Sequence, residues 1–269
     1  MLGKVFKYEI KETSRLFLPL MMGFILITAL CKFSFEGSIS IFSDQSNILN
    51  AITGVFFLLY FIYIIALFVM TSVFIVTNFY KTMVSNQGYL THTLPVKTST
   101  LINAKLLVAI FWEIMAGLLF ILSIILFILG HVNISDINEI LKNFLDFMDY
   151  MSVYINVPSF FIKIFISTIL TLISGPVTLY ASIAIGHLFN KHRVLWAVIS
   201  FFCIYMANQL INSVVTGFIA DRYSAYNFED IGASFSNGFM LYSIFYTIIT
   251  TSILYILTNY IFSRKLNLE

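Results

Sequence analysis

The sequence predicts an all-α integral membrane protein with six transmembrane helices, and two observations lead to this fold class. The chain has 269 residues, of which 59% are hydrophobic and only 10% are charged, whereas a soluble domain carries about 25% charged residues. A soluble core of this size could not bury so much apolar surface. The apolar stretches also run without alternation for about 20 residues or more, which is the length of a membrane-crossing helix and not the pattern of a membrane β-barrel.

The six spans follow from these stretches and from the turn-forming or charged residues between them. We expect them at Leu16–Phe35, Ala51–Thr77, Leu106–Gly130, Phe160–Phe189, Leu195–Ile219 and Gly238–Phe262. Lysine and arginine collect in the loops on one side: residues 4, 7, 11 and 15, then 81, 97 and 105, then 191 and 193, then 264 and 265. This excess marks the cytoplasmic face, so an even number of spans places both termini in the cytoplasm.

The N-terminal residues 1–15 precede the first span and are expected to form an interfacial amphipathic helix. Leu2, Val5, Phe6 and Ile10 fall on one helical face, with lysines elsewhere, a pattern typical of helices that lie on the membrane surface. The alternative is a charged anchor that only sets the topology. Residues 16–269 are expected to form the six-span transmembrane domain.

Two extracellular segments have a character of their own. In segment 131–159, apolar residues recur at helical spacing from Ile137 to Met151, and Ser135 can cap the helix, so we expect an amphipathic helix that lies on the outer leaflet or roofs the bundle, with Pro158 ending the segment. Segment 220–237 is aromatic and partly apolar. We expect it to re-enter the membrane before the last span, where protein or water must cover its backbone.

Few polar residues lie inside the spans, and these are the candidate pathway residues. Glu113 is an intramembrane carboxylate, which serves transport or is held structurally, for instance by Lys105. Asn208 and Asn212 share a face of the fifth span at i, i+4 and either line a pathway or bond a neighbouring helix. Gly175 and Pro176 interrupt the fourth span, which predicts a kink or a gating hinge.

Motifs of enzymatic chemistry are missing from the sequence. It has no GxxxxGK[ST] phosphate loop, no HExxH and no GxSxG. Its two cysteines give no metal-ligand spacing. A net charge of +2 is too small to indicate nucleic-acid binding. We therefore expect a chain that is not itself an enzyme and that binds no metal, cofactor or nucleic acid.

Two stretches resemble short bacterial ABC exporter permeases of the second, ABC-2-like class. The first is MLGKVFKYEIKETSRLFLP at residues 1–19. The second is GYLTHTLPV at residues 88–96, followed by TSTLINAK at residues 98–105. The resemblance implies that the cytoplasmic loop 78–105 couples the spans to an ATPase, through the residues Gln87, Gly88, Tyr89, Leu90, Thr91, Leu94 and Pro95.

The resemblance also implies partners, a location and a function. Two ATP-binding cassette subunits would carry the ATP and magnesium, and a second permease copy, identical or different, would complete the membrane unit in the lipid of a bacterial cytoplasmic membrane. The substrate would be a hydrophobic or amphipathic molecule, and we favour a peptide. The alternatives are export of a lipid or small drug, and a stand-alone secondary transporter or channel.

Overall fold

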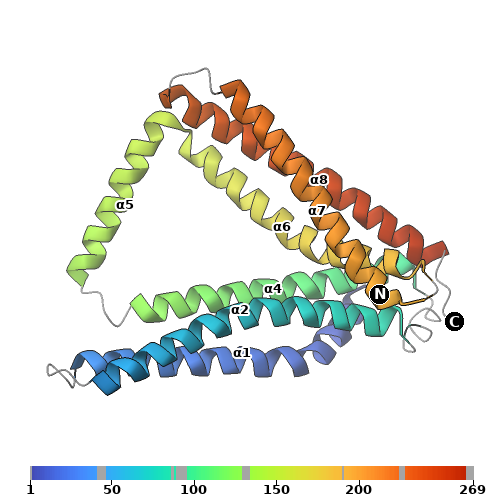
Figure 1. Ribbon diagram of the computed structural model, residues 1–269, viewed down its shortest axis with the longest axis horizontal. Helices are drawn as coiled ribbons and strands as arrows, with labels where there is room; N and C mark the ends of the chain where they lie inside the picture. Colours follow the sequence, from blue (N-terminus) through green and yellow to red (C-terminus); the bar gives the residue numbers. More distant parts are fainter. Residues whose placement is uncertain are drawn as a thin grey trace. The chain divides into compact units, whose positions relative to one another are not determined.

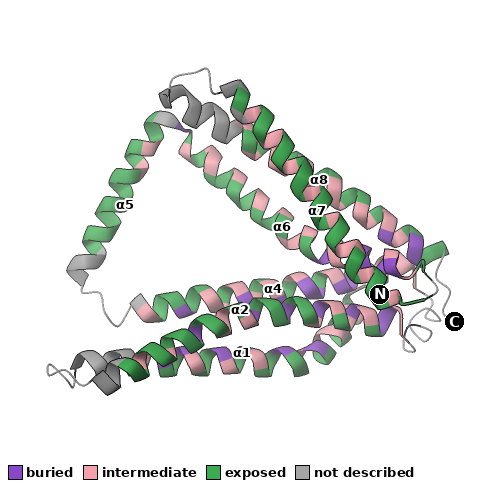
Figure 2. Cartoon of the chain, in the orientation of Figure 1, coloured by how far each residue is buried: buried purple, intermediate pink, exposed green. Residues whose placement is uncertain are grey.

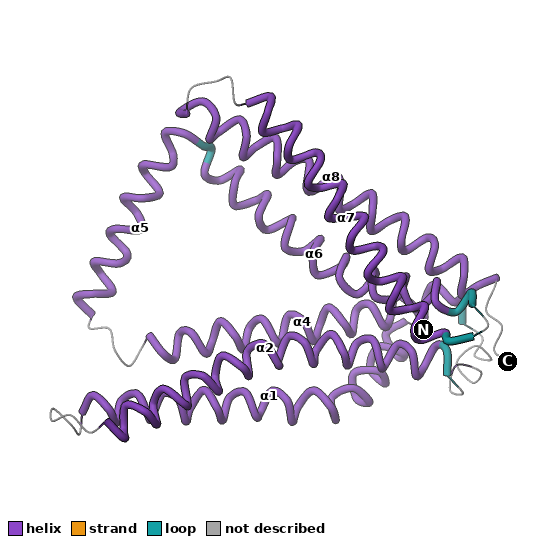
Figure 3. The backbone as a smooth tube through the Cα atoms, in the orientation of Figure 1, coloured by secondary structure: helices purple, strands orange, loops and turns teal. Residues whose placement is uncertain are grey.

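The structure is a computed structural model, and it describes residues 2–40, 47–85, 88, 96–128, 134–189, 191–223 and 228–264. In this part of the chain it is helical, with no strand (Figures 1 and 3). Its long helices are α1 (Leu2–Ser40), α2 (Asn47–Met83), α4 (Thr98–Ile128), α5 (Ile134–Tyr154), α6 (Val157–Gly186), α7 (Arg193–Tyr223) and α8 (Phe228–Arg264).

Six of these helices are long and apolar enough to cross a membrane, which confirms the predicted multi-pass membrane protein. The apolar segments are Leu2–Ser34, Ala51–Met83, Thr98–Phe127, Val157–Gly186, Arg193–Ile219 and Gly238–Arg264. Each contains or overlaps one predicted span. Several helices continue past the predicted ends into the polar stretches that flank the apolar runs.

The first helix runs through the boundary that the sequence suggested between an interfacial segment and the first span. Residues 2–15 and the apolar residues after them are one continuous helix, α1, which contains Pro19. Figure 1 shows α1 bending toward its N-terminal end. A proline inside a helix lacks the backbone donor and clashes with the preceding turn, which bends the helix on that side. The placement of residues 1–15 on the membrane surface stays a prediction.

The two segments that the sequence predicts to be extracellular are largely helical where the structure describes them. The predicted amphipathic helix is α5, and the next helix begins at Val157, where the side chain of Asn156 accepts from the N–H of Ser159 at 3.1 Å. Pro158 therefore lies in the first turn of α6, where a proline is tolerated because the first N–H groups lack helical partners. From Phe228 on, segment 220–237 is the beginning of α8, and its re-entry into the membrane stays a prediction.

The chain divides into two compact units. The first consists of residues 1–82 and 103–137, and the second of residues 83–102 and 138–269. The core of the first unit lies where α1, α2 and α4 meet, and it includes Phe24, Tyr60, Leu67 and Ala116. The hydroxyl of Tyr60 bonds that of Ser123 at 2.8 Å, so this apolar core also contains a satisfied polar pair.

The second unit packs α7 and α8 against α6. At the end of α6, a Cβ on Gly186 would lie 2.6 Å from the backbone nitrogen of Ala197. Only glycine therefore fits where α6 and α7 approach each other. The rings of Phe189 and Trp196 stack at a centroid distance of 4.2 Å beside this contact.

Exposed apolar side chains extend along the spans of both units (Figure 2). In a soluble protein such long apolar surfaces would be unfavourable. On helices of membrane-crossing length they are the surfaces that lipid, or other membrane protein, covers. The exposed apolar side chains and the hydrophobic composition therefore both indicate that lipid surrounds the spans.

Candidate functional site

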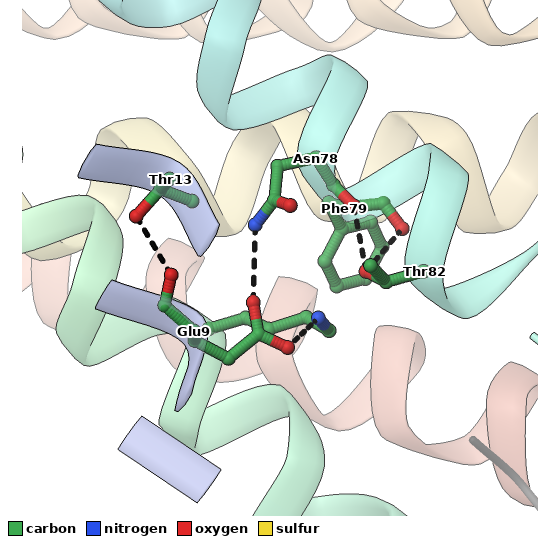
Figure 4. Close-up of polar contacts among 6 residues, drawn as sticks. Glu9, Thr13, Asn78, Phe79 and Thr82 are labelled. Carbon is green, nitrogen blue, oxygen red and sulfur yellow. Dashed lines mark hydrogen bonds and ion pairs between the residues drawn. The ribbon is translucent and has the colours of Figure 1, made fainter. Parts of the chain in front are cut away.

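A buried polar cluster joins three helices of the first unit (Figure 4). We call it the Glu9 cluster, and it consists of Glu9 and Thr13 on α1, Asn78 on α2, and Lys105 and Trp112 on α4. The Glu9 carboxylate is its centre. One oxygen accepts from Lys105 Nζ at 2.5 Å, and the other accepts from the amide of Asn78 at 3.2 Å. A single side chain of α1 is thereby bonded to both other helices.

Burial strengthens the attraction between these two charges, but it also removes their hydration. The side chain of Lys105 is 1% exposed and that of Glu9 is 13% exposed. Two charges so far from water lose much of their hydration, and their attraction offsets this loss only while the geometry is kept and further hydrogen bonds are made. The Asn78 amide supplies such a bond to Glu9. The pair therefore fixes where the beginning of α1 lies against α2 and α4.

The next turn of α1 continues the junction with an aromatic layer. The hydroxyl of Thr13 donates to the backbone carbonyl of Glu9 at 2.8 Å and accepts from the indole N–H of Trp112 at 2.9 Å. The Trp112 ring stacks on Phe17 with centroids 4.5 Å apart, and Phe17 meets Phe74 edge-on at 5.3 Å. Polar bonds and aromatic packing thus hold the same three helices together over two turns.

The Glu9 cluster lies at the two ends of the predicted coupling loop. Asn78 is on the last turns of α2, before the loop, and Lys105 is on the first turns of α4, after it. Of the predicted coupling residues, Gln87, Tyr89, Leu90, Thr91, Leu94 and Pro95 lie outside the described residues. Gly88 is described: it is buried, and its N–H donates to the carbonyl of Ser85 at 2.6 Å.

Most of the predicted coupling loop and the helices on its two sides belong to different units. The helices on both sides, α2 up to Thr82 and α4 from Asn103, are part of the first unit, whereas residues 83–102 are part of the second. Met83, Leu101 and Ile102 are among the most buried side chains of the protein. The described residues that adjoin the loop are therefore packed inside the protein.

Glu113 is a half-buried carboxylate within α4. The sequence offered Lys105 as a partner for Glu113, but in the structure Lys105 pairs with Glu9. Within the described part of the chain, no hydrogen bond or ion pair to Glu113 is formed. A carboxylate inside a span that is not paired within its own unit retains the functional interest that intramembrane carboxylates have.

Asn208 and Asn212 are brought together with two tyrosines of α8. The hydroxyl of Tyr246 donates to Asn208 Oδ1 at 2.5 Å, and the hydroxyl of Tyr242 donates to Asn212 Oδ1 at 3.2 Å. Both pairs follow the i, i+4 spacing of their helices, so they form a double hydrogen-bonded seam between α7 and α8. The helix-bonding role that the sequence allowed for these amides therefore exists in the structure.

The hinge candidates lie within an unbroken helix. Pro176 is buried and Gly175 is exposed, and α6 continues through both from Val157 to Gly186. The hydroxyl of Thr178 donates to the carbonyl of Ser174 at 2.7 Å beside them. Whether the pair acts as a gating hinge stays a prediction.

The sequence analysis missed the centre of the Glu9 cluster. Glu9 was grouped with a basic amphipathic segment, and its partners follow 69 and 96 residues later in the chain. One signal was present, since Glu9 and Glu12 are the only two carboxylates in an otherwise basic stretch from residue 1 to residue 35. A carboxylate among lysines before an apolar run is a reason to look for an internal cationic partner.

Comparison with known protein families, with curated proteins and with solved structures finds no match to the chain. Within the described residues, no group of three or more histidine, cysteine or acidic side chains could hold a metal ion.

Proposed function

We propose that this chain is the membrane-spanning permease subunit of an ATP-driven ABC exporter, which moves a hydrophobic or amphipathic substrate out of the cell. ATP hydrolysis belongs to separate ATP-binding cassette subunits, which dock at the cytoplasmic loop 78–105. A second permease copy, identical or related, completes the unit in the cytoplasmic membrane. The observation that carries the proposal is the Glu9 cluster, because it bonds both flanks of that loop to the beginning of α1.

A partner bound at the loop would act on both ends of the loop together. Asn78 and Lys105 both bond Glu9, so a displacement of either loop flank pulls on the same carboxylate. The aromatic layer of Phe17 and Trp112 extends this attachment along α1. A force on the loop is then shared by α1, α2 and α4 instead of bending one helix, which is what rigid-body switching of a transporter requires.

A partner can drive the spans only if the two conformations of the permease differ in their affinity for the ATP-bound partner. Residues 83–102 of the loop belong to the second unit, and the parts of α2 and α4 on either side, with Asn78 and Lys105, belong to the first.

The substrate class follows from the surfaces of the spans. No Asp, Glu, Lys or Arg occurs between Arg193 and Asp221 or between Gly238 and Arg264. A pathway along α7 and α8 would be lined by apolar, aromatic and neutral polar side chains, which suits an amphipathic molecule better than a small ion. We favour a peptide, and a lipid or small drug is the alternative.

The test is co-expression of the chain with the ATPase encoded beside it, purification through a tag on the permease, and measurement of ATP hydrolysis in lipid nanodiscs. We expect the ATPase to copurify and its activity to depend on the permease. Lys105→Met should weaken this dependence, whereas Glu12→Gln, at an exposed position of α1, should not. If a correctly folded chain recruits no ATPase, the proposal fails, and ion flux through the isolated chain would test the stand-alone transporter instead.

A further inference from the structure

A stripe of polar side chains runs along the middle of α7. We call it the α7 polar stripe, and it consists of Tyr205, Asn208, Gln209 and Asn212. With 3.6 residues per turn, positions 205, 209 and 212 share one face, and position 208 adjoins it. The stripe lies around the centre of the 27-residue segment Arg193–Ile219, which is the depth at which an unsatisfied polar group is most unfavourable.

The side of the stripe nearest α8 is half satisfied. The two asparagine oxygens accept hydroxyl groups from Tyr246 and Tyr242. These bonds orient the amides and leave their NH₂ groups as donors. Among the described residues, no acceptor bonds the NH₂ group of Asn208 or of Asn212.

The other side of the stripe is unsatisfied. Tyr205 is 56% exposed and Gln209 is also exposed. In the described part of the chain, neither the Tyr205 hydroxyl nor the Gln209 amide makes a hydrogen bond. Lipid tails offer no hydrogen bonds, so a bilayer core alone is a poor environment for this surface.

We infer that the α7 polar stripe binds the backbone of an amphipathic peptide, by pairing its amide and hydroxyl groups with the peptide's C=O and N–H groups. The inference rests on the proposed export function and names the substrate class. A primary amide is both a donor and an acceptor, and a peptide backbone supplies both partners. Lipid esters supply acceptors only, so they would leave the Gln209 oxygen unpaired.

The surroundings of the stripe fit the rest of such a ligand. Phe202, Met206 and Leu210 on the adjoining face are exposed and apolar, and they can pack against apolar side chains of the peptide. Charged side chains are absent from α7 between Arg193 and Asp221. The surface therefore offers partners to the backbone and to the apolar face of the peptide, and none to its charged side chains.

The experiment measures peptide binding to the full-length chain in phosphatidylcholine nanodiscs, without any ATPase. The probe is a fluorescent synthetic peptide of leucine and lysine with an amphipathic pattern, compared with an analogue in which alternate backbone amides are esters. Gln209→Leu should weaken binding of the all-amide peptide about fivefold or more, the effect of losing one or two hydrogen bonds. Gln209→Asn should retain part of the affinity, and Val214→Leu, an apolar exchange at an exposed position on the opposite face of α7, should retain all of it.

The ester analogue distinguishes backbone recognition from general apolar binding. It should bind the native chain more weakly than the all-amide peptide, and Gln209→Leu should reduce that difference. Equal affinities of both peptides for all variants would overturn the inference. Efficient disulfide crosslinking of two Gln209→Cys chains in a Cys203→Ser background, together with unchanged peptide binding, would also overturn it and assign the stripe to a subunit interface. The peptide-binding experiment contains no ATPase. If the chain recruits no ATPase in the separate copurification experiment, the export proposal fails, but the peptide-binding result is unaffected.

Discussion

Replacing Glu9 by glutamine tests whether the Glu9 cluster holds the first unit together. The substitution keeps the shape of the side chain and an acceptor oxygen, and removes only the negative charge opposite Lys105, whose side chain is 1% exposed. Removing one partner of a buried ion pair costs about 3–5 kcal/mol, because the other charge loses its main compensation; Glu12 exerts a smaller attraction on Lys105 than Glu9 does. We therefore expect Glu9→Gln to be strongly destabilising.

The size of the effect can be followed by thermal unfolding in detergent. For a chain of this length, 1 kcal/mol corresponds to a shift in Tm of roughly 2–4 °C, so the expected decrease is about 6–20 °C. Glu12→Gln is the matched control, since it removes the same charge three residues later on α1, at an exposed position. It should lower Tm by only a small fraction of that amount.

A double-mutant cycle with Lys105→Met then separates the ion pair from its surroundings. Once the ammonium is gone, the Glu9→Gln substitution no longer strands a charge, so the double variant should be more stable than the sum of the two single losses predicts. We expect a coupling energy of about 2–3 kcal/mol. Additive losses, or a Glu9→Gln chain as stable as the Glu12→Gln control, would refute the idea that this pair fixes α1 against α4.

Three further predictions concern other contacts of the two units. Gly186→Ala should cost about 1–3 kcal/mol because its Cβ would meet the backbone of Ala197, and Gly117→Ala, with nothing within 4 Å, should cost nothing; unfolding of the two variants compares them directly. Trp112→Phe keeps the ring stack but loses the 2.9 Å bond to the α1 threonine, and should lower stability by about 1 kcal/mol. Burial lowers the pKa of His187, so the unfolded chain binds its proton first and acidification through about pH 6.5 should lower Tm; a His187→Gln chain whose Tm falls as steeply with pH would contradict this.

The spans could be predicted because they depend on composition alone. An apolar run of about 20 residues needs no knowledge of its neighbours to be identified as a membrane helix. The ends of the helices depend on more. Pro158 read as the end of a segment, but the cap supplied by Asn156 makes it the first turn of α6, and a proline is equally compatible with both positions.

The two polar sites differ in how much the sequence could reveal. Asn208 and Asn212 are four residues apart, so their shared helix face follows from the helical period, and the structure adds only the identity of the partners, Tyr246 and Tyr242. Glu9 and Lys105 are 96 residues apart. No local periodicity relates them, and the pair emerges only when α1 and α4 are packed together.

The polar side chains within the spans fall into two classes, those that have a hydrogen-bond or ion-pair partner in their own unit and those that have none among the described residues. Lys105 and the two asparagine oxygens have partners within their own unit, and such groups hold helices together. Glu113 and Gln209 form no hydrogen bond with the described residues. Hydrocarbon offers such groups no hydrogen-bond partner, so each is a candidate contact for water, for a substrate or for another chain. The internally bonded groups hold the helices of their unit together, whereas the exposed amide of Gln209 is the group that the proposed peptide would contact.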